Sequence, residues 1–128
     1  MTDVSPMIHQ TLLGDAWEHA HVAAAIFSDD GRYLACNEAF CRLTGYSREE
    51  IGRMRVGVDL AVEPPKNEKL FQEIVALQRT SGSGSLRRKD GTALTVNFWA
   101  IETQVAGLPY FVVLSWDAAE RPKRRLVG

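Results

Sequence analysis

The amino-acid sequence predicts a single α+β domain built around an antiparallel sheet. Two strand-like segments occur near the N-terminus, three more lie after residue 85, and amphipathic helical segments separate the two groups. This chain order is typical of an antiparallel sheet whose helices gather on one face. The 128 residues, of which 45% are hydrophobic, are sufficient for one core. No internal repeat or second domain is visible.

The composition excludes several classes of partner. With 15 Lys and Arg against 16 Asp and Glu, the formal charge is −1, so nucleic acid is not expected to bind. The longest apolar runs, residues 22–27 and 108–114, are much shorter than the roughly 18 residues of a membrane span. Cys36 and Cys41 lie in largely apolar surroundings and are interpreted as buried thiols, which favours a reducing cytoplasm.

Residues 1–21 are predicted to form an N-terminal helical cap. Pro6 suits the first position of a helix. Gly14 is expected to interrupt this helix, and Asp15 with Glu18 has the spacing of a capping box that would open a second short helix. The apolar side chains of this segment that share one face are Ile8, Leu12, Leu13 and Trp17.

The first strands and the first internal helix follow directly. Residues 22–27 and 32–36 are predicted to be two strands joined by a tight turn. Asn37 is a plausible N-cap for the next helix, and Gly45 is expected to end it.

Two further helices are predicted in the middle of the chain, separated by an irregular segment. Ser47 and Glu50 have capping-box spacing, which indicates another short helix. Residues 53–65 show no periodicity, whereas residues 66–80 carry apolar side chains at helical spacing. The Ser/Gly run at residues 81–85 is interpreted as a flexible connection.

The remainder of the chain is predicted to be β structure. Residues 86–89, 92–104 and 110–116 are the expected strands. Turns at Asp90-Gly91 and Ala106-Gly107 separate them.

Together these segments resemble the PAS family of sensory domains. The resemblance rests on residues 22–37, on residues 39–52, on the Arg-Lys-Asp-Gly-Thr motif at 88–92, and on Asp117 at the end of the last strand. It implies the PAS fold, a five-stranded antiparallel sheet with helices on one face. It also implies a regulatory role without catalysis, and a pocket for haem, flavin, a small metabolite or nothing. Residues 22–117 would be the PAS domain, and residues 118–128 a basic tail or linker.

The site residues argue against two cofactor classes. Light-sensing flavin (LOV-type) PAS domains are similar through residues 46–51 but continue into a segment with a flavin-reactive cysteine, and residues 53–60 contain none. Where those domains place a glutamine, this chain has Ser115. Oxygen-sensing haem PAS domains take a histidine from the middle helices, and residues 37–80 contain none. We therefore assign no cofactor, metal or catalytic residue, and a haem or flavin sensor is the weaker alternative.

Strand alternation predicts which side chains face the helices. Analogy with the flavin-binding members places one face of the last two strands inward, opposite apolar positions of the helices. The candidate pocket residues are Phe40, Leu43, Leu70, Ile74, Val96, Phe98, Ala100, Phe111, Val113 and Ser115. The alternative that these side chains simply fill a packed core stays open, because few polar groups converge there.

The opposite sheet face is predicted to form an apolar patch too large to remain in water. Its members would be Trp99, Ile101, Val112, Leu114 and Trp116. The N-terminal cap would cover it, from the same subunit or from a twofold mate. We expect a homodimer, and a monomer with an intramolecular cap is the alternative.

Asp117, Glu120 and Arg121 resemble the junction that links PAS domains to an output helix. Pro122 interrupts that helix, and we expect no kinase or DNA-binding domain in this chain. The sequence thus predicts a cytoplasmic, bacterial PAS sensor that homodimerises and takes a small, mostly apolar ligand. The alternative is a ligand-free adaptor that associates with a kinase or transcription regulator.

Overall fold

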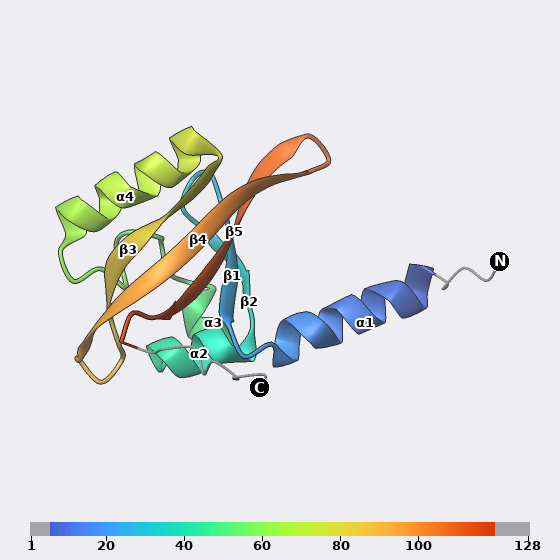
Figure 1. Ribbon diagram of the computed structural model, residues 1–128, viewed down its shortest axis with the longest axis horizontal. Coiled ribbons are helices and arrows are strands. Elements are labelled where there is room, and N and C mark those ends of the chain that lie inside the picture. The colour runs from blue at the N-terminus through green and yellow to red at the C-terminus, as the bar shows by residue number, and fades with distance from the viewer. Residues whose placement is uncertain (1–5, 120–128) are drawn as a thin grey trace, which may run out of the picture.

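The computed structural model describes residues 6–119, and describes side chains from residue 13 onward. Helices and strands follow one another in nearly the predicted order (Figure 1). Their bounds are α1 (Pro6–His19), β1 (Ala23–Ser28), β2 (Tyr33–Cys36), α2 (Glu38–Thr44), α3 (Arg48–Ile51), α4 (Pro64–Leu77), β3 (Arg79–Arg87), β4 (Ala93–Val105) and β5 (Leu108–Asp117).

The five strands form one antiparallel sheet in the order β2-β1-β5-β4-β3. The first two strands and the last three therefore meet along the pairing of β1 with β5. Helix α2 packs on β1, α3 on β2, and α4 on β3 and β4. The predicted α+β class, with a five-stranded antiparallel sheet and helices on one face, is confirmed.

The two short helices begin and end where their capping residues predict. The side chain of Asn37 accepts a hydrogen bond from the backbone N–H of Phe40 at 3.0 Å, and Gly45 ends α2 at a φ of 80°. Ser47 Oγ accepts from the N–H of Glu50 at 3.1 Å, and the Glu50 carboxylate accepts from the N–H of Ser47 at 2.9 Å. Both helix starts are thus fixed by side chains a few residues away.

The core lies between the sheet and the helices as two adjoining clusters. One, beneath α2 and α3, consists of Ala23, Ala25, Cys36, Ala39, Phe40, Ile51 and Leu60. The other, beneath α4, consists of Phe27, Ile74, Phe98, Ala100 and Phe111. In the second cluster the rings of Phe27 and Phe111 stack with centroids 5.5 Å apart.

The break that we expected at Gly14 was wrong. Helix α1 runs without interruption from Pro6 to His19. Gly14 is exposed, and no atom lies within 4 Å of the position that its Cβ would occupy. A glycine at an exposed helical position costs about 1 kcal/mol relative to alanine, and a 14-residue helix tolerates that cost.

The flexible connection that we expected at residues 81–85 was also wrong, because these residues form the middle of strand β3. The preceding helix ends at Leu77, earlier than residue 80, and Gln78 turns the chain at a φ of 64°. The two glycines of the run are the points where other side chains approach the strand. A Cβ on Gly82 would lie 3.4 Å from the Phe98 ring, and one on Gly84 would lie 3.0 Å from Leu70 Cδ2. Close packing, and not flexibility, accounts for the glycines in this segment.

Candidate functional site

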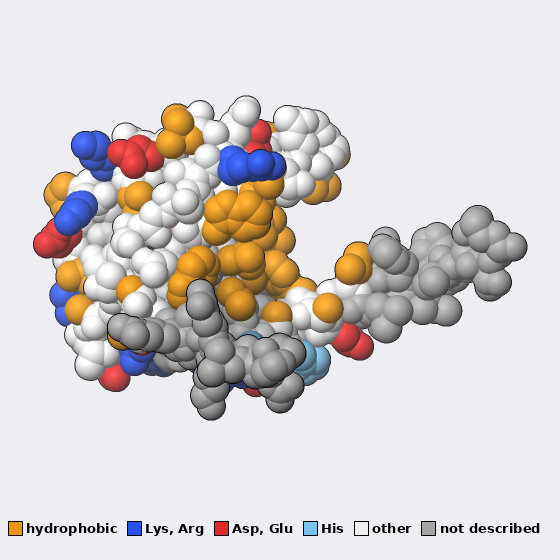
Figure 2. Space-filling view, viewed as in Figure 1, with side chains coloured by type: hydrophobic (Ala, Val, Ile, Leu, Met, Phe, Trp, Pro, Cys, Tyr) orange, Lys and Arg blue, Asp and Glu red, His pale blue; other side chains and the backbone are white. Residues whose placement is uncertain are grey.

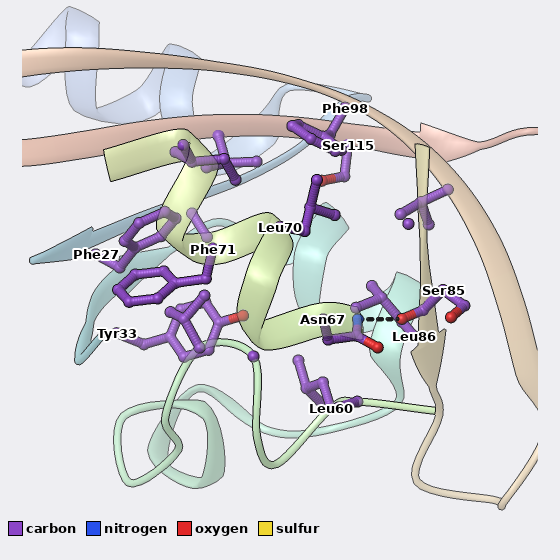
Figure 3. Close-up of a pocket in the computed structure, with 18 of the residues that line it drawn as sticks. Phe27, Tyr33, Leu60, Asn67, Leu70, Phe71, Ser85, Leu86, Phe98 and Ser115 are labelled. Atoms are coloured by element: carbon purple, nitrogen blue, oxygen red, sulfur yellow. Dashed lines mark hydrogen bonds between the residues drawn. The ribbon is translucent and has the colours of Figure 1, made fainter. Parts of the chain in front are cut away.

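A cavity of about 90 Å³ lies between the inner face of the sheet and helix α4 (Figure 3). Its walls come from all five strands, from α2 and α4, and from the segment before α4. The lining residues are Ala25, Phe27, Tyr33, Phe40, Val56, Gly57, Leu60, Ala61, Asn67, Leu70, Phe71, Ile74, Gly84, Ser85, Leu86, Val96, Phe98, Val113 and Ser115. Most of this lining is apolar, so the cavity is suited to an apolar molecule.

The shape of the cavity depends on how α4 approaches the sheet. Asn67, in the first turn of α4, donates from Nδ2 to the backbone carbonyl of Ser85 at 2.9 Å. This hydrogen bond connects α4 to β3 next to Gly84. Because glycine has no side chain, Leu70 can approach the strand closely at this point. The Asn67 amide is therefore part of the wall, and one of its two N–H donors is already used, while its Oδ1 accepts from the backbone N–H of Glu63 at 3.3 Å.

Besides Ser85, the lining has two hydroxyl-bearing residues, Ser115 and Tyr33. Ser115 is only 6% exposed and lies on β5, at the inner face of the sheet. Tyr33 packs against the rings of Phe27 and Phe40 and turns its hydroxyl toward α4 (Figure 3). Burial, with the nearby Asp59 carboxylate, raises the pKa of Tyr33 above its ordinary value, so this hydroxyl stays protonated at neutral pH. A protonated phenol can donate a hydrogen bond to a ligand.

Seven of the ten candidate pocket residues line the cavity, and three do not. The seven are Phe40, Leu70, Ile74, Val96, Phe98, Val113 and Ser115. Ala100 and Phe111 are buried in the core cluster beneath α4, and Leu43 packs against the core cluster beneath α2 and α3.

Sequence reasoning missed the aromatic wall formed by Phe27, Tyr33 and Phe71. For Phe27 a signal was present. It alternates with Ala23 and Ala25 along β1, so the same rule that oriented the last two strands places all three on the inner face.

The cavity does not fit haem or flavin. An engineered cavity of about 150 Å³ takes a single benzene, and this one holds about 90 Å³, far less than a haem or a flavin ring system occupies. Its lining contains neither the histidine nor the cysteine that would ligate haem iron or react with flavin. Among the described residues, no group of three His, Cys, Asp or Glu side chains could hold a metal ion.

The outer face of the sheet carries the predicted apolar patch (Figure 2). Trp99 is 42% exposed and Trp116 is 38% exposed, with Leu114 half-buried between them in the β4–β5 pairing. Val112 and Ile101, also half-buried, are paired next to them toward the β4–β5 turn.

Helix α1 extends away from the sheet and does not lie over this patch (Figure 1). Its Leu13 is 57% exposed, whereas Trp17, one turn later, is half-buried. The side chains of Ile8 and Leu12 lie outside the described residues.

The predicted output junction is described only in part. Asp117 ends β5, and its carboxylate accepts a hydrogen bond of 2.9 Å from the backbone N–H of Ala119. Arg88, from the turn between β3 and β4, lines a surface hollow together with Asp117. The Nε of Arg88 is buried without a hydrogen-bond partner among the described residues. Glu120 and Arg121 lie outside the described part of the chain.

Within residues 6–119, no helix is long and apolar enough to cross a membrane.

Comparisons with known proteins place this geometry in a family. The model of the PAS domain matches residues 22–115, which is more than half of the chain. The chain therefore belongs to the PAS family, whose members are sensory modules of signal transduction and typically lack catalysis. No curated protein matches the chain.

Several solved structures share the fold. A domain of a sensory box sensor histidine kinase/response regulator from Geobacter sulfurreducens has 24% identity and a TM-score of 0.72, over 87% of this chain and 96% of that one. An RNA-binding Light-Oxygen-Voltage receptor has 20% identity and a TM-score of 0.78, over 90% of this chain and 35% of that one. The PAS domain of a LuxR-family transcriptional regulator from Burkholderia thailandensis, solved in complex with ethanol, has 14% identity and a TM-score of 0.70, over 84% and 97%.

Proposed function

We propose that this PAS domain senses a small, mostly apolar molecule in the cavity between the sheet and α4, and that it acts as a homodimer. The single observation that carries the ligand proposal is the cavity itself, which has a mostly apolar lining that includes the hydroxyl-bearing residues Tyr33 and Ser115. An apolar wall with one or two polar groups is the usual design of a small-molecule site.

The size of the cavity limits the ligand. At about 90 Å³ it would admit a molecule of a few non-hydrogen atoms, such as a short-chain alcohol, with its hydroxyl toward Ser115 or Tyr33. The LuxR-family PAS domain that was solved with ethanol is an example of this fold together with a molecule of that class.

Mass spectrometry of the freshly purified protein tests the ligand proposal. The same sample is measured under native and under denaturing conditions, together with an absorbance scan. An additional non-covalent mass that is lost on denaturation, without a visible absorption band, is the expected result. A bare chain mass, and no chemical-shift change at Ser115 or Val113 on titration with ethanol, would overturn the proposal.

The second candidate function is an adaptor without a ligand. The observation that favours it is the tight approach of α4 to β3, where Leu70 would meet a Cβ on Gly84 at 3.0 Å. In that function the cavity would be a packing defect, and the PAS domain would act by associating with a kinase or a transcription regulator.

The homodimer proposal rests on the outer sheet face. Trp99 and Trp116 expose a large part of their apolar surface on neighbouring strands, and α1 does not cover them within the same subunit. An apolar patch of this kind marks an interaction site in soluble proteins. A twofold mate that laid its own α1 and outer sheet face on this patch would bury both patches at once. We place this dimer in the bacterial cytoplasm, in keeping with the two free thiols.

A further inference from the structure

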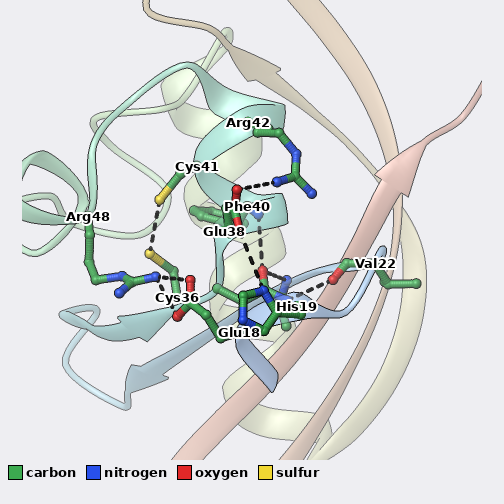
Figure 4. A network of polar contacts seen from close by, with 11 residues as sticks. Glu18, His19, Val22, Cys36, Glu38, Phe40, Cys41, Arg42 and Arg48 are labelled. Atoms are coloured by element: carbon green, nitrogen blue, oxygen red, sulfur yellow. Dashed lines mark hydrogen bonds and ion pairs between the residues drawn. The ribbon is translucent and has the colours of Figure 1, made fainter. Parts of the chain in front are cut away.

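The two cysteines of the chain meet at the start of α2. Cys36 is the last residue of β2 and Cys41 lies in α2, and their Sγ atoms are 3.7 Å apart (Figure 4). The capping of α2 by Asn37 holds them in place, because it fixes the path of the chain between the two residues. The two sulfurs are in van der Waals contact and must move closer together to reach the about 2.05 Å of a disulfide.

The two thiols differ in their access to solvent. Cys36 is 3% exposed, whereas Cys41 is partly exposed. A surface hollow of about 280 Å³ also reaches Cys36, and Trp17, Glu18 and Arg48 line it together with this cysteine. A small polar oxidant can therefore approach the pair from the surface.

We propose that Cys36 and Cys41 form a redox site, in which a hydroperoxide converts the two thiols into a reversible intramolecular disulfide. The more exposed Cys41 thiol attacks the peroxide oxygen and becomes a sulfenic acid, and the peroxide leaves as an alcohol or as water. The Cys36 sulfur then attacks Cys41 Sγ, the sulfur–sulfur bond forms, and the hydroxyl of the sulfenic acid leaves with the thiol proton as water. Two thiols are oxidised and one peroxide is reduced. A dithiol reductant reverses the step.

The charged and titratable groups around the pair set its rate. Burial raises the pKa of the Cys36 thiol to about 11, the neighbouring Cys41 adds to this, and the Arg48 guanidinium opposes it. Arg48 is itself paired with Glu18, and the Tyr33 hydroxyl is nearby and neutral. Because the thiolate is the attacking form, closure of the disulfide is slow at neutral pH and accelerates as the pH rises toward 11.

The same contacts connect the redox site to α1. Arg48 adjoins Cys36 on one side and holds Glu18, in the last turn of α1, at 2.7 Å on the other (Figure 4). Closing the disulfide moves the Cys36 sulfur, which lines the same hollow as Arg48 and Glu18, and so changes the surroundings of the ion pair that holds the end of α1. This last step rests on the proposed dimer, to which α1 contributes, whereas the disulfide does not depend on it.

The test is the intact mass of the full chain after treatment with one equivalent of hydrogen peroxide. The wild-type protein should become lighter by two hydrogen atoms and lose both free thiols, and dithiothreitol should restore both. Peptide mapping should join Cys36 to Cys41. The closing step should be about a hundredfold faster at pH 9 than at pH 7, because the thiolate fraction of Cys36 rises about tenfold per pH unit below its pKa.

Cysteine variants distinguish the thiol that attacks the peroxide, Cys41, from the thiol that closes the disulfide, Cys36. Cys36→Ser should stop at a chain heavier by one oxygen atom, which dimedone traps at Cys41, and Cys41→Ser should react more slowly than wild type. Ser47→Ala, which changes a neighbouring helix cap and leaves both thiols, is the control and should close the disulfide as wild type does. A wild-type chain that gains oxygen without losing two hydrogens, or that forms only disulfides between chains, would overturn the proposal. The disulfide is read from the mass of the denatured chain, whereas the dimer is read from the native mass. Failure of the proposed dimer is therefore distinguished from failure of the redox site.

Discussion

The backbone N–H of Ala24 donates a hydrogen bond of 2.9 Å to Oδ1 of Asn37, a residue thirteen positions later in the chain. The same oxygen accepts from the N–H of Phe40, and Nδ2 of Asn37 donates to the carbonyl of Val22 at 2.9 Å. Asn37 is fully buried. One amide side chain therefore joins strand β1, the second strand of the sheet, to the start of α2.

Replacing Asn37 with alanine should destabilise the domain by about 3 kcal/mol. The variant loses a helix N-cap, worth about 1 kcal/mol, and leaves the N–H of Ala24 buried without a partner, which costs about 1–3 kcal/mol. Urea unfolding followed by circular dichroism measures the change. Ser47→Ala, at the exposed cap of α3, should cost only about 1 kcal/mol. Equal losses in the two variants would contradict the role assigned to Asn37.

The features that the sequence predicted well are local. The caps of α2 and α3 depend on residues at most a few positions apart, such as Ser47 and Glu50, and both were found where the spacing placed them. The five-stranded antiparallel sheet was predicted from the motifs shared with the PAS family. The strand order and the pairing of β1 with β5 were not predicted, because they join segments far apart in the chain.

The features that the sequence did not predict depend on contacts between distant segments. Gly82 and Gly84 looked like a flexible connection, because nothing local shows that Phe98 and Leu70 occupy the space above them. The predicted set of cavity-lining residues was incomplete for the same reason. Asn67 could not be assigned to it without knowing that its side chain reaches Ser85.

Replacing Trp99 with glutamate should convert the proposed dimer into a monomer. A carboxylate at the centre of an apolar interface loses its hydration on association, and we expect dimerisation to weaken by at least about tenfold, or 1.4 kcal/mol. Light scattering coupled to size-exclusion chromatography measures the mass. Leu77→Glu, at an apolar residue on α4 that is 59% exposed, is the matched control and should leave the dimer intact. A Trp99→Glu variant that elutes with the wild-type mass would rule out this interface.

The stability of the domain should fall as the pH rises above 10, in part through Tyr33. Burial raises the pKa of Tyr33 in the folded state above its ordinary value of 10.0. The unfolded chain therefore loses this proton first, and above pH 10 it binds fewer protons than the folded state, so the free energy of unfolding decreases with pH. Tyr33→Phe removes this contribution. Urea midpoints measured from pH 8 to pH 11 should decline less steeply for the variant, and parallel curves would contradict the assignment.

The cavity is tested most directly by two adjacent valines on β5. Val113 lines the cavity, whereas Val112 lies on the opposite face of the same strand and pairs with Ile101 in the outer patch. Val113→Phe should fill a cavity of about 90 Å³ and abolish the chemical-shift changes that ethanol causes at Ser115. Val112→Phe adds the same volume outside the cavity and should leave those changes as in wild type. Because both variants enlarge the same strand by the same side chain, a loss of binding in only Val113→Phe places the ligand between the sheet and α4. Retained binding in Val113→Phe would place it elsewhere.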